Sequence, residues 1–214
     1  VFGLVLSVMN LSFYAAIDRL PLGTAVTLEF LGPLGVALAG ARRRRDLIWV
    51  ALAAGGVFLL SGGIGGGSEI LGVALALLAA ACWAAYIVLN ARLGRHEGLA
   101  PLALAMAASA VMTLPFGIGA VGEGLLSPAT LATGLAVGLL SSALPYALEL
   151  EALRTLPNSV FGVLMSLEPA VAALIGFLAL SQGLSAADIV AVAMVVIASA
   201  GALRRAGARP PVVD

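Results

Sequence analysis

The sequence predicts an all-α integral membrane protein, in which eight transmembrane helices of a probable ten belong to two inverted five-helix repeats. Three observations carry this prediction. Hydrophobic residues make up 62% of the 214 residues and charged residues 10%, whereas soluble domains are roughly 25% charged. The mean hydropathy is +1.13, and the apolar residues fall into runs of about 20, the length that crosses a ~30 Å hydrocarbon layer. The residue pattern of one of these runs is also repeated near the C-terminus.

Hydropathy places eight helix-length segments along the chain. They are residues 1–17, 22–40, 47–63, 70–89, 100–119, 131–153, 157–180 and 187–203. The connections between them are short and rich in Gly, Pro, Ser or charge, as connections between antiparallel helices should be.

The arginines orient the segments. If the loop with Arg42–Arg45 is cytoplasmic, alternation of eight helices places ten of the eleven arginines on that side, and only Arg19 falls opposite. This agrees with the positive-inside rule. It predicts a multi-pass protein with a cytoplasmic C-terminus.

An internal repeat underlies the two-fold organisation. Phe13–Gly40 superposes on Glu149–Gly176 at an offset of 136, with nine identities in 28 positions and Pro33 aligned on Pro169. With the orientation that the arginines indicate, the two copies cross the membrane in opposite directions. Inverted repeats of this kind are typical of secondary transporters, which bind substrate near the membrane midplane.

The repeat also divides the chain. We expect residues 1–63 to form the last three helices of the first repeat, 70–203 the second repeat of five helices, and 204–214 a cytoplasmic tail. Because the sequence opens at Val1 inside an apolar run and shows no signal peptide, we expect two helices upstream.

Glu29 and Glu168 fall near the centres of their segments. A charge in lipid is costly, so an intramembrane acid is a functional hypothesis by default. Burial penalises the charged form, and such a carboxyl group could bind a proton at one stage and a substrate ammonium at another. The alternative is a hydrogen-bonded packing group. Glu149, nearer the cytoplasmic end of its segment, is a third candidate, or else an acid at headgroup level.

Polar and amphipathic side chains inside the segments could orient a substrate. Tyr146 lies one helical turn from Glu149, which favours it. Tyrosine and tryptophan also populate interfacial belts, so this plainer role stays open for the other candidates, Asn10, Tyr14 and Trp83.

Three prolines within the segments predict helix kinks: Pro33, Pro145 and Pro169. Each leaves the carbonyl four residues earlier without a donor, and for Pro33 that carbonyl belongs to Glu29. Free carbonyls at membrane depth are tolerated where protein or a water-filled cavity satisfies them. The alternative is a kink that only shapes packing.

The sequence offers no enzyme, metal or cofactor motif. It has a single histidine, His96, and a single cysteine, Cys82, so neither a metal cluster nor an internal disulfide can be built. Gly62–Gly67 lacks the Lys-Ser/Thr of a phosphate loop. The segments carry no basic residue at membrane depth, which disfavours phosphate-bearing substrates and nucleic acid and favours a cation or a zwitterion. A zwitterion's carboxylate would need amides or hydroxyls, for example those of Ser141, Ser142 or Ser166.

Four phrases resemble the EamA-type drug/metabolite transporter superfamily, and within it the bacterial threonine/homoserine exporters of the Rht type. They read LPLGTAVTLEFLGPLGVAL, ACWAAYIVLNAR, SSALPYALELEALRTLP and VFGVLMSLEPAVAALIGFLAL. The resemblance implies ten helices in two inverted repeats, a bacterial inner-membrane location, and export of small amino acids or related metabolites. Many members carry an acidic residue after the LSLEP helix, where this chain reads Ser181-Gln182-Gly183. We therefore expect no carboxylate role in that loop.

The sequence thus predicts a secondary active exporter of small amino acids, working by alternating access as a proton-coupled antiporter. Its expected partners are the amino acid, protons and membrane lipid. Two alternatives stay open: a non-transporting sensor or assembly component, and an exporter of a different small cationic or zwitterionic metabolite.

Overall fold

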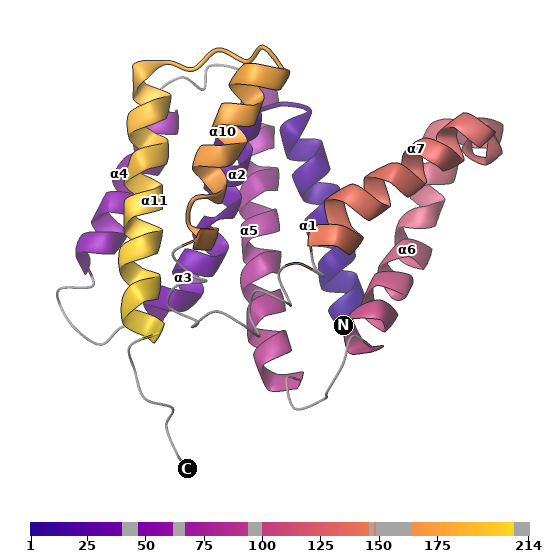
Figure 1. Ribbon diagram of the computed structural model, residues 1–214, viewed down its shortest axis with the longest axis horizontal. Helices are drawn as coiled ribbons and strands as arrows, with labels where there is room; N and C mark the ends of the chain where they lie inside the picture. Colours follow the sequence, from indigo (N-terminus) through magenta and orange to yellow (C-terminus); the bar gives the residue numbers. More distant parts are fainter. Residues whose placement is uncertain (40–46, 62–66, 94–99, 146–147, 149–163, 208–214) are drawn as a thin grey trace.

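The computed structural model describes residues 1–39, 47–61, 67–93, 100–145, 148 and 164–207, and these residues contain helices and no strand (Figure 1). The elements are α1 (Phe2–Ile17), α2 (Leu22–Glu29), α3 (Leu31–Ala39), α4 (Leu47–Ser61), α5 (Gly67–Leu93), α6 (Ala100–Val121), the 3-10 turn η2 (Gly122–Leu126), α7 (Pro128–Gly138), the π-helical turn η3 (Leu139–Ala143), α10 (Glu168–Ala179) and α11 (Ala186–Gly207).

The described helices overlap the segments that hydropathy predicts, and where both ends of a segment are described they differ by a few residues. The start of α7 shows why: Ser127 accepts a hydrogen bond from the Thr130 N–H at 3.1 Å, and Pro128 occupies the first helical position. Among the described residues, one helical stretch, Glu69–Leu89, is long and apolar enough to cross a membrane by length and composition alone. The apolar stretches of the other helices are 10–17 residues long. The count of eight spanning helices stays a prediction.

Two of the predicted continuous segments are interrupted. α2 ends at Glu29, Phe30 forms a turn, and α3 begins at Leu31; in the second copy Ser166 and Leu167 form a turn before α10 begins at Glu168. Positions 30 and 166 are equivalent at the repeat offset of 136. Both acids lie at these interruptions, Glu29 as the last residue of α2 and Glu168 as the first residue of α10.

The cause is the proline that follows each interruption. Pro33 and Pro169 cannot donate a backbone N–H to the carbonyl four residues earlier. In the first turn of a new helix, however, the N–H groups have no intrahelical partner, so proline fits there. Pro33 is accordingly the third residue of α3 and Pro169 the second of α10.

Small residues allow the helices to pack closely. α1 packs against α5 and α6, α4 against α11, and α2 against both α5 and α10 (Figure 1). A Cβ added at Gly23 on α2 would lie 2.6 Å from the Cα and Cβ atoms of Ala173 on α10. Small residues at helix contacts are characteristic of membrane proteins, where packing replaces the hydrophobic driving force.

α2 and α10 run antiparallel, and Gln182 ties them at one end. The start of α2 at Leu22 lies beside the end of α10 at Gly176. Pro21 precedes α2 and supplies no side-chain cap, so the Gln182 side-chain oxygen accepts the Leu22 N–H at 2.9 Å. The loop for which the sequence suggested no carboxylate role thus caps a helix of the other repeat copy through an amide.

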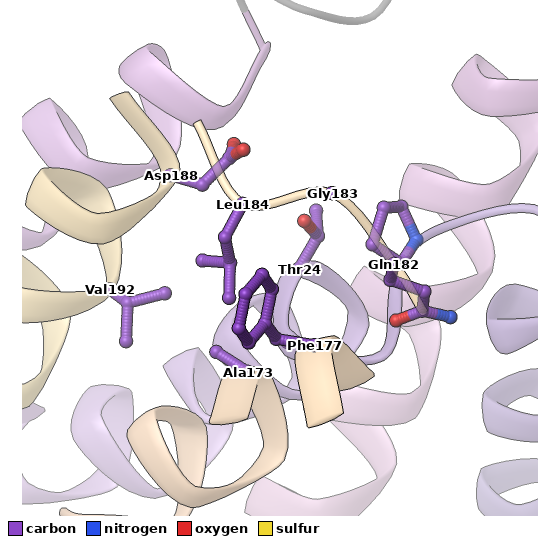
Figure 2. A pocket seen from close by; sticks show the side chains of 10 residues that line it. Thr24, Ala173, Phe177, Gln182, Gly183, Leu184, Asp188 and Val192 are labelled. Atoms are coloured by element: carbon purple, nitrogen blue, oxygen red, sulfur yellow. The ribbon is translucent and has the colours of Figure 1, made fainter. Parts of the chain in front are cut away.

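A small pocket lies beside this contact (Figure 2). Its volume is about 20 Å³, room for a water molecule and too little for an amino acid. Figure 2 shows Phe177 and Leu184 at its centre, with Gln182 and Asp188 on opposite sides. Asp188 accepts hydrogen bonds from the backbone and hydroxyl of Ser185 and so caps α11.

Large apolar side chains cover the outside of the helices. Phe58 on α4 is 76% exposed, and Leu104 and Val111 on α6 are 72% and 71% exposed. Water-soluble monomers rarely expose contiguous apolar surface on this scale. The surface fits contact with lipid.

We predict that Gly23→Ala destabilises the fold by about 1–3 kcal/mol, because its methyl group would overlap Ala173 and push α2 from α10. Gly35→Ala is the matched control, since nothing lies within 4 Å of a Cβ at that position. Detergent or thermal unfolding of the purified variants measures the difference. Equal stability of the two variants would contradict the packing described here.

Candidate functional site

A cavity of about 640 Å³ lies between α1, α2, α5, η3 and α10. It gathers eight of the residues singled out from the sequence: Asn10, Tyr14, Glu29, Trp83, Ser141, Ser142, Pro145 and Glu168. Pro33 and Pro169 lie in the helices that begin after the two interruptions, outside the lining. Tyr146 and Glu149 lie outside the described residues.

α1 and α5 provide an aromatic and polar wall. Asn10, Phe13 and Tyr14 follow each other at the spacing of one helical face. On α5, Trp83 packs edge-to-face against Phe30, with ring centroids 5.6 Å apart. The turn residue that interrupts the first copy therefore also fixes the orientation of a cavity side chain.

Tyr86, one turn beyond Trp83, is fixed in the same way. Its ring stacks on that of Phe2 at a centroid distance of 5.2 Å. Both aromatic residues of α5 that line the cavity are thus held by residues outside α5, so this wall is formed before any ligand binds.

The two helix interruptions place the carboxyl groups of Glu29 and Glu168 at the cavity. Glu29 is partly buried and Glu168 is exposed toward the cavity, and they are close enough for their charges to interact. They come from opposite kinds of helix end. Glu29 is the last residue of α2, and Glu168 is the first residue of α10.

The lining residues that the structure describes include no Arg, Lys or His. Nor does any group of three or more His, Cys, Asp or Glu come together among the described residues. Among the described lining residues, the two acids stand with Asn10 and Tyr14, a set that suits a small organic cation or the ammonium end of a zwitterion.

Several lining residues were not anticipated from the sequence. Met9, Phe13, Leu164, Met165, Leu167 and Val171 complete the cavity. Only their spacing from the polar candidates could have pointed to them, because Met9 and Phe13 flank Asn10 and Tyr14 on α1. Apolar side chains in an apolar chain carry no signal of their own.

Comparison with known proteins decides the family. The profile of the EamA-like transporter family matches residues 70–204. The chain is 45% identical over 202 residues to the threonine/homoserine exporter RhtA of Salmonella typhimurium (strain LT2), covering 94% of this chain and 68% of that protein. It is 43% identical over the same length to the RhtA of Escherichia coli (strain K12).

The chain belongs to the EamA-like transporter family. The resemblance found in the sequence is confirmed, and with it a multi-pass inner-membrane protein of a transporter family. No solved structure matches the chain. The all-helical bundle, its exposed apolar surface and its central acidic cavity agree with membership of the EamA-like family.

We predict that the cavity admits water in the membrane. In a Cys82→Ala background, Asn10→Cys should react with a charged, water-soluble thiol reagent, because Asn10 lines the cavity. Ile197→Cys should not react, since Ile197 is 55% exposed in the middle of α11, where lipid would cover it. Mass spectrometry of membranes treated with the reagent measures both. Equal labelling would argue against a water-filled site.

Proposed function

We propose that the protein is a secondary active exporter of small amino acids of the threonine/homoserine kind, working by alternating access around the central cavity. The observation that carries the proposal is the convergence of Glu29 and Glu168, one from each repeat copy, in a cavity with Asn10 and Tyr14. The relatives that cover 94% of the chain are themselves threonine/homoserine exporters.

The lining suits such a substrate. The acidic pair provides a binding place for an ammonium group, and the neutral polar groups can satisfy the rest of a zwitterion. The volume of about 640 Å³ lies in the ordinary range of ligand cavities, about 300–1,000 Å³. A small amino acid would fit with some water.

The inverted repeat provides the mechanical basis for alternating access. We take residues 1–63 and 70–203 as parts of two upside-down copies in a molecule of ten helices. The antiparallel course of α2 and α10 and the interruptions at equivalent positions support this arrangement. In such transporters, broken helices meet at the substrate site and the halves rock about it.

The orientation from the arginines places the C-terminus in the cytoplasm and the contact between Leu22 and Gln182 toward the outside. With the cavity open inward, a deprotonated carboxylate takes up the amino acid by its ammonium group. After the halves rock, a proton from outside competes for the carboxylate and the substrate leaves.

We predict that Glu29→Gln and Glu168→Gln each lower threonine export by at least roughly tenfold, because each removes a charge-assisted contact. Asp18→Asn is the control: it removes a carboxyl group at the end of α1, away from the cavity. Efflux of labelled threonine or homoserine from cells expressing the full-length protein measures the effect. Full export by both glutamine variants would remove the acidic pair from the mechanism.

We predict that a pH gradient imposed across proteoliposomes, acidic on the outer side, accelerates threonine efflux. The proton and the ammonium compete for the same carboxylate, so proton entry drives amino-acid exit. Flux that is indifferent to the gradient would eliminate proton coupling and leave facilitated exchange.

A further inference from the structure

The helix that continues from α7 changes its winding where it reaches the cavity. η3 is a π-helical turn, and the Leu144 N–H donates to the Leu139 carbonyl five residues back. Pro145 follows and has no N–H to donate. π-helical turns are rare and occur mostly at functional sites.

The π-turn sets two hydroxyl groups on the cavity wall. Ser141 and Ser142 both line the cavity, together with Pro145. A π-turn winds more residues into each turn than an α-helix does, so neighbouring side chains point in more similar directions. Within the part of the chain that the structure describes, neither hydroxyl has a hydrogen-bond partner. Each is therefore available to donate to a ligand.

A zwitterion in this cavity must place its carboxylate away from the acids. With its ammonium held by Glu29 and Glu168, like-charge repulsion drives its carboxylate to another wall. Among the described lining residues, the groups that can stabilise this carboxylate are hydrogen-bond donors. Two adjacent hydroxyls can donate to the two oxygens of one carboxylate, whereas Asn10 and Tyr14 lie a full turn apart on α1.

We infer that η3 is the carboxylate-binding wall of the site, where the hydroxyls of Ser141 and Ser142 donate to the carboxylate of an α-amino acid. This inference rests on the proposed function and deepens it. It makes the site selective for amino acids over amines that lack the carboxylate.

Three ligands separate the contributions of the substrate's ammonium, carboxylate and side-chain hydroxyl groups to binding. L-threonine carries all three groups, threoninol lacks the carboxylate, and L-2-aminobutyrate lacks the side-chain hydroxyl. The test compares their dissociation constants for the purified full-length protein and its Ser141→Ala/Ser142→Ala variant. Thr133→Val is the control, because it removes a hydroxyl from α7 at a position outside the cavity lining.

We expect the double variant to bind threonine and 2-aminobutyrate roughly tenfold more weakly, the usual effect of losing hydrogen bonds to a charged group. Its affinity for threoninol should be unchanged, and Thr133→Val should match the wild type throughout. If the double variant melts at a lower temperature, the single variants Ser141→Ala and Ser142→Ala should show the same ligand pattern with smaller changes.

Equal weakening of all three ligands, or no weakening, would overturn the inference and leave the proposed function intact. Weakening of threonine alone would also overturn it, because the serines would then recognise the substrate hydroxyl. If the wild type bound neither threonine nor homoserine, the proposed function itself would fail.

Discussion

The structure depends on two prolines that cannot complete a helix. Pro33 and Pro169 end the regular hydrogen bonding of the preceding turn, and each interruption falls inside the bundle. Backbone groups released at membrane depth are tolerated only where protein or a water-filled cavity satisfies them. The interruption and the cavity therefore require each other, and the side chains at the interruptions, Glu29 and Glu168, line that cavity.

Close packing then brings the two interrupted helices together. Lipid tails are as apolar as the side chains, so burial alone does not drive helices to associate in a membrane. Gly23 against Ala173 lets α2 and α10 approach closely, and Gln182 fixes the register at one end through the Leu22 N–H. With the register fixed, the last residue of α2 and the first of α10 reach the same cavity.

The sequence predicts the helices and most of the polar site because both leave strong signals. Apolar runs mark the helices, and charges or amides in such runs, as at Asn10, Glu29 and Glu168, stand out. The interruption at Phe30 is harder to predict, since a proline three residues later fits either a kink or a new helix. The cap by Gln182 is a contact across 160 positions, and η3 follows from local winding; neither leaves a pattern in the sequence.

In the proposed exporter, the two acids of the cavity favour the exchange of one bound cation for another. The carboxylates of Glu29 and Glu168 lie close enough for their charges to interact, so a negative charge on one makes a negative charge on the other less favourable. Their mutual repulsion is relieved by a proton or by a bound ammonium. A site that is most stable with one bound cation releases that cation most readily when another cation replaces it. In the proposed exporter, coupling between amino-acid exit and proton entry would need no further residue, because the substrate ammonium and the proton would compete for the same pair of acids.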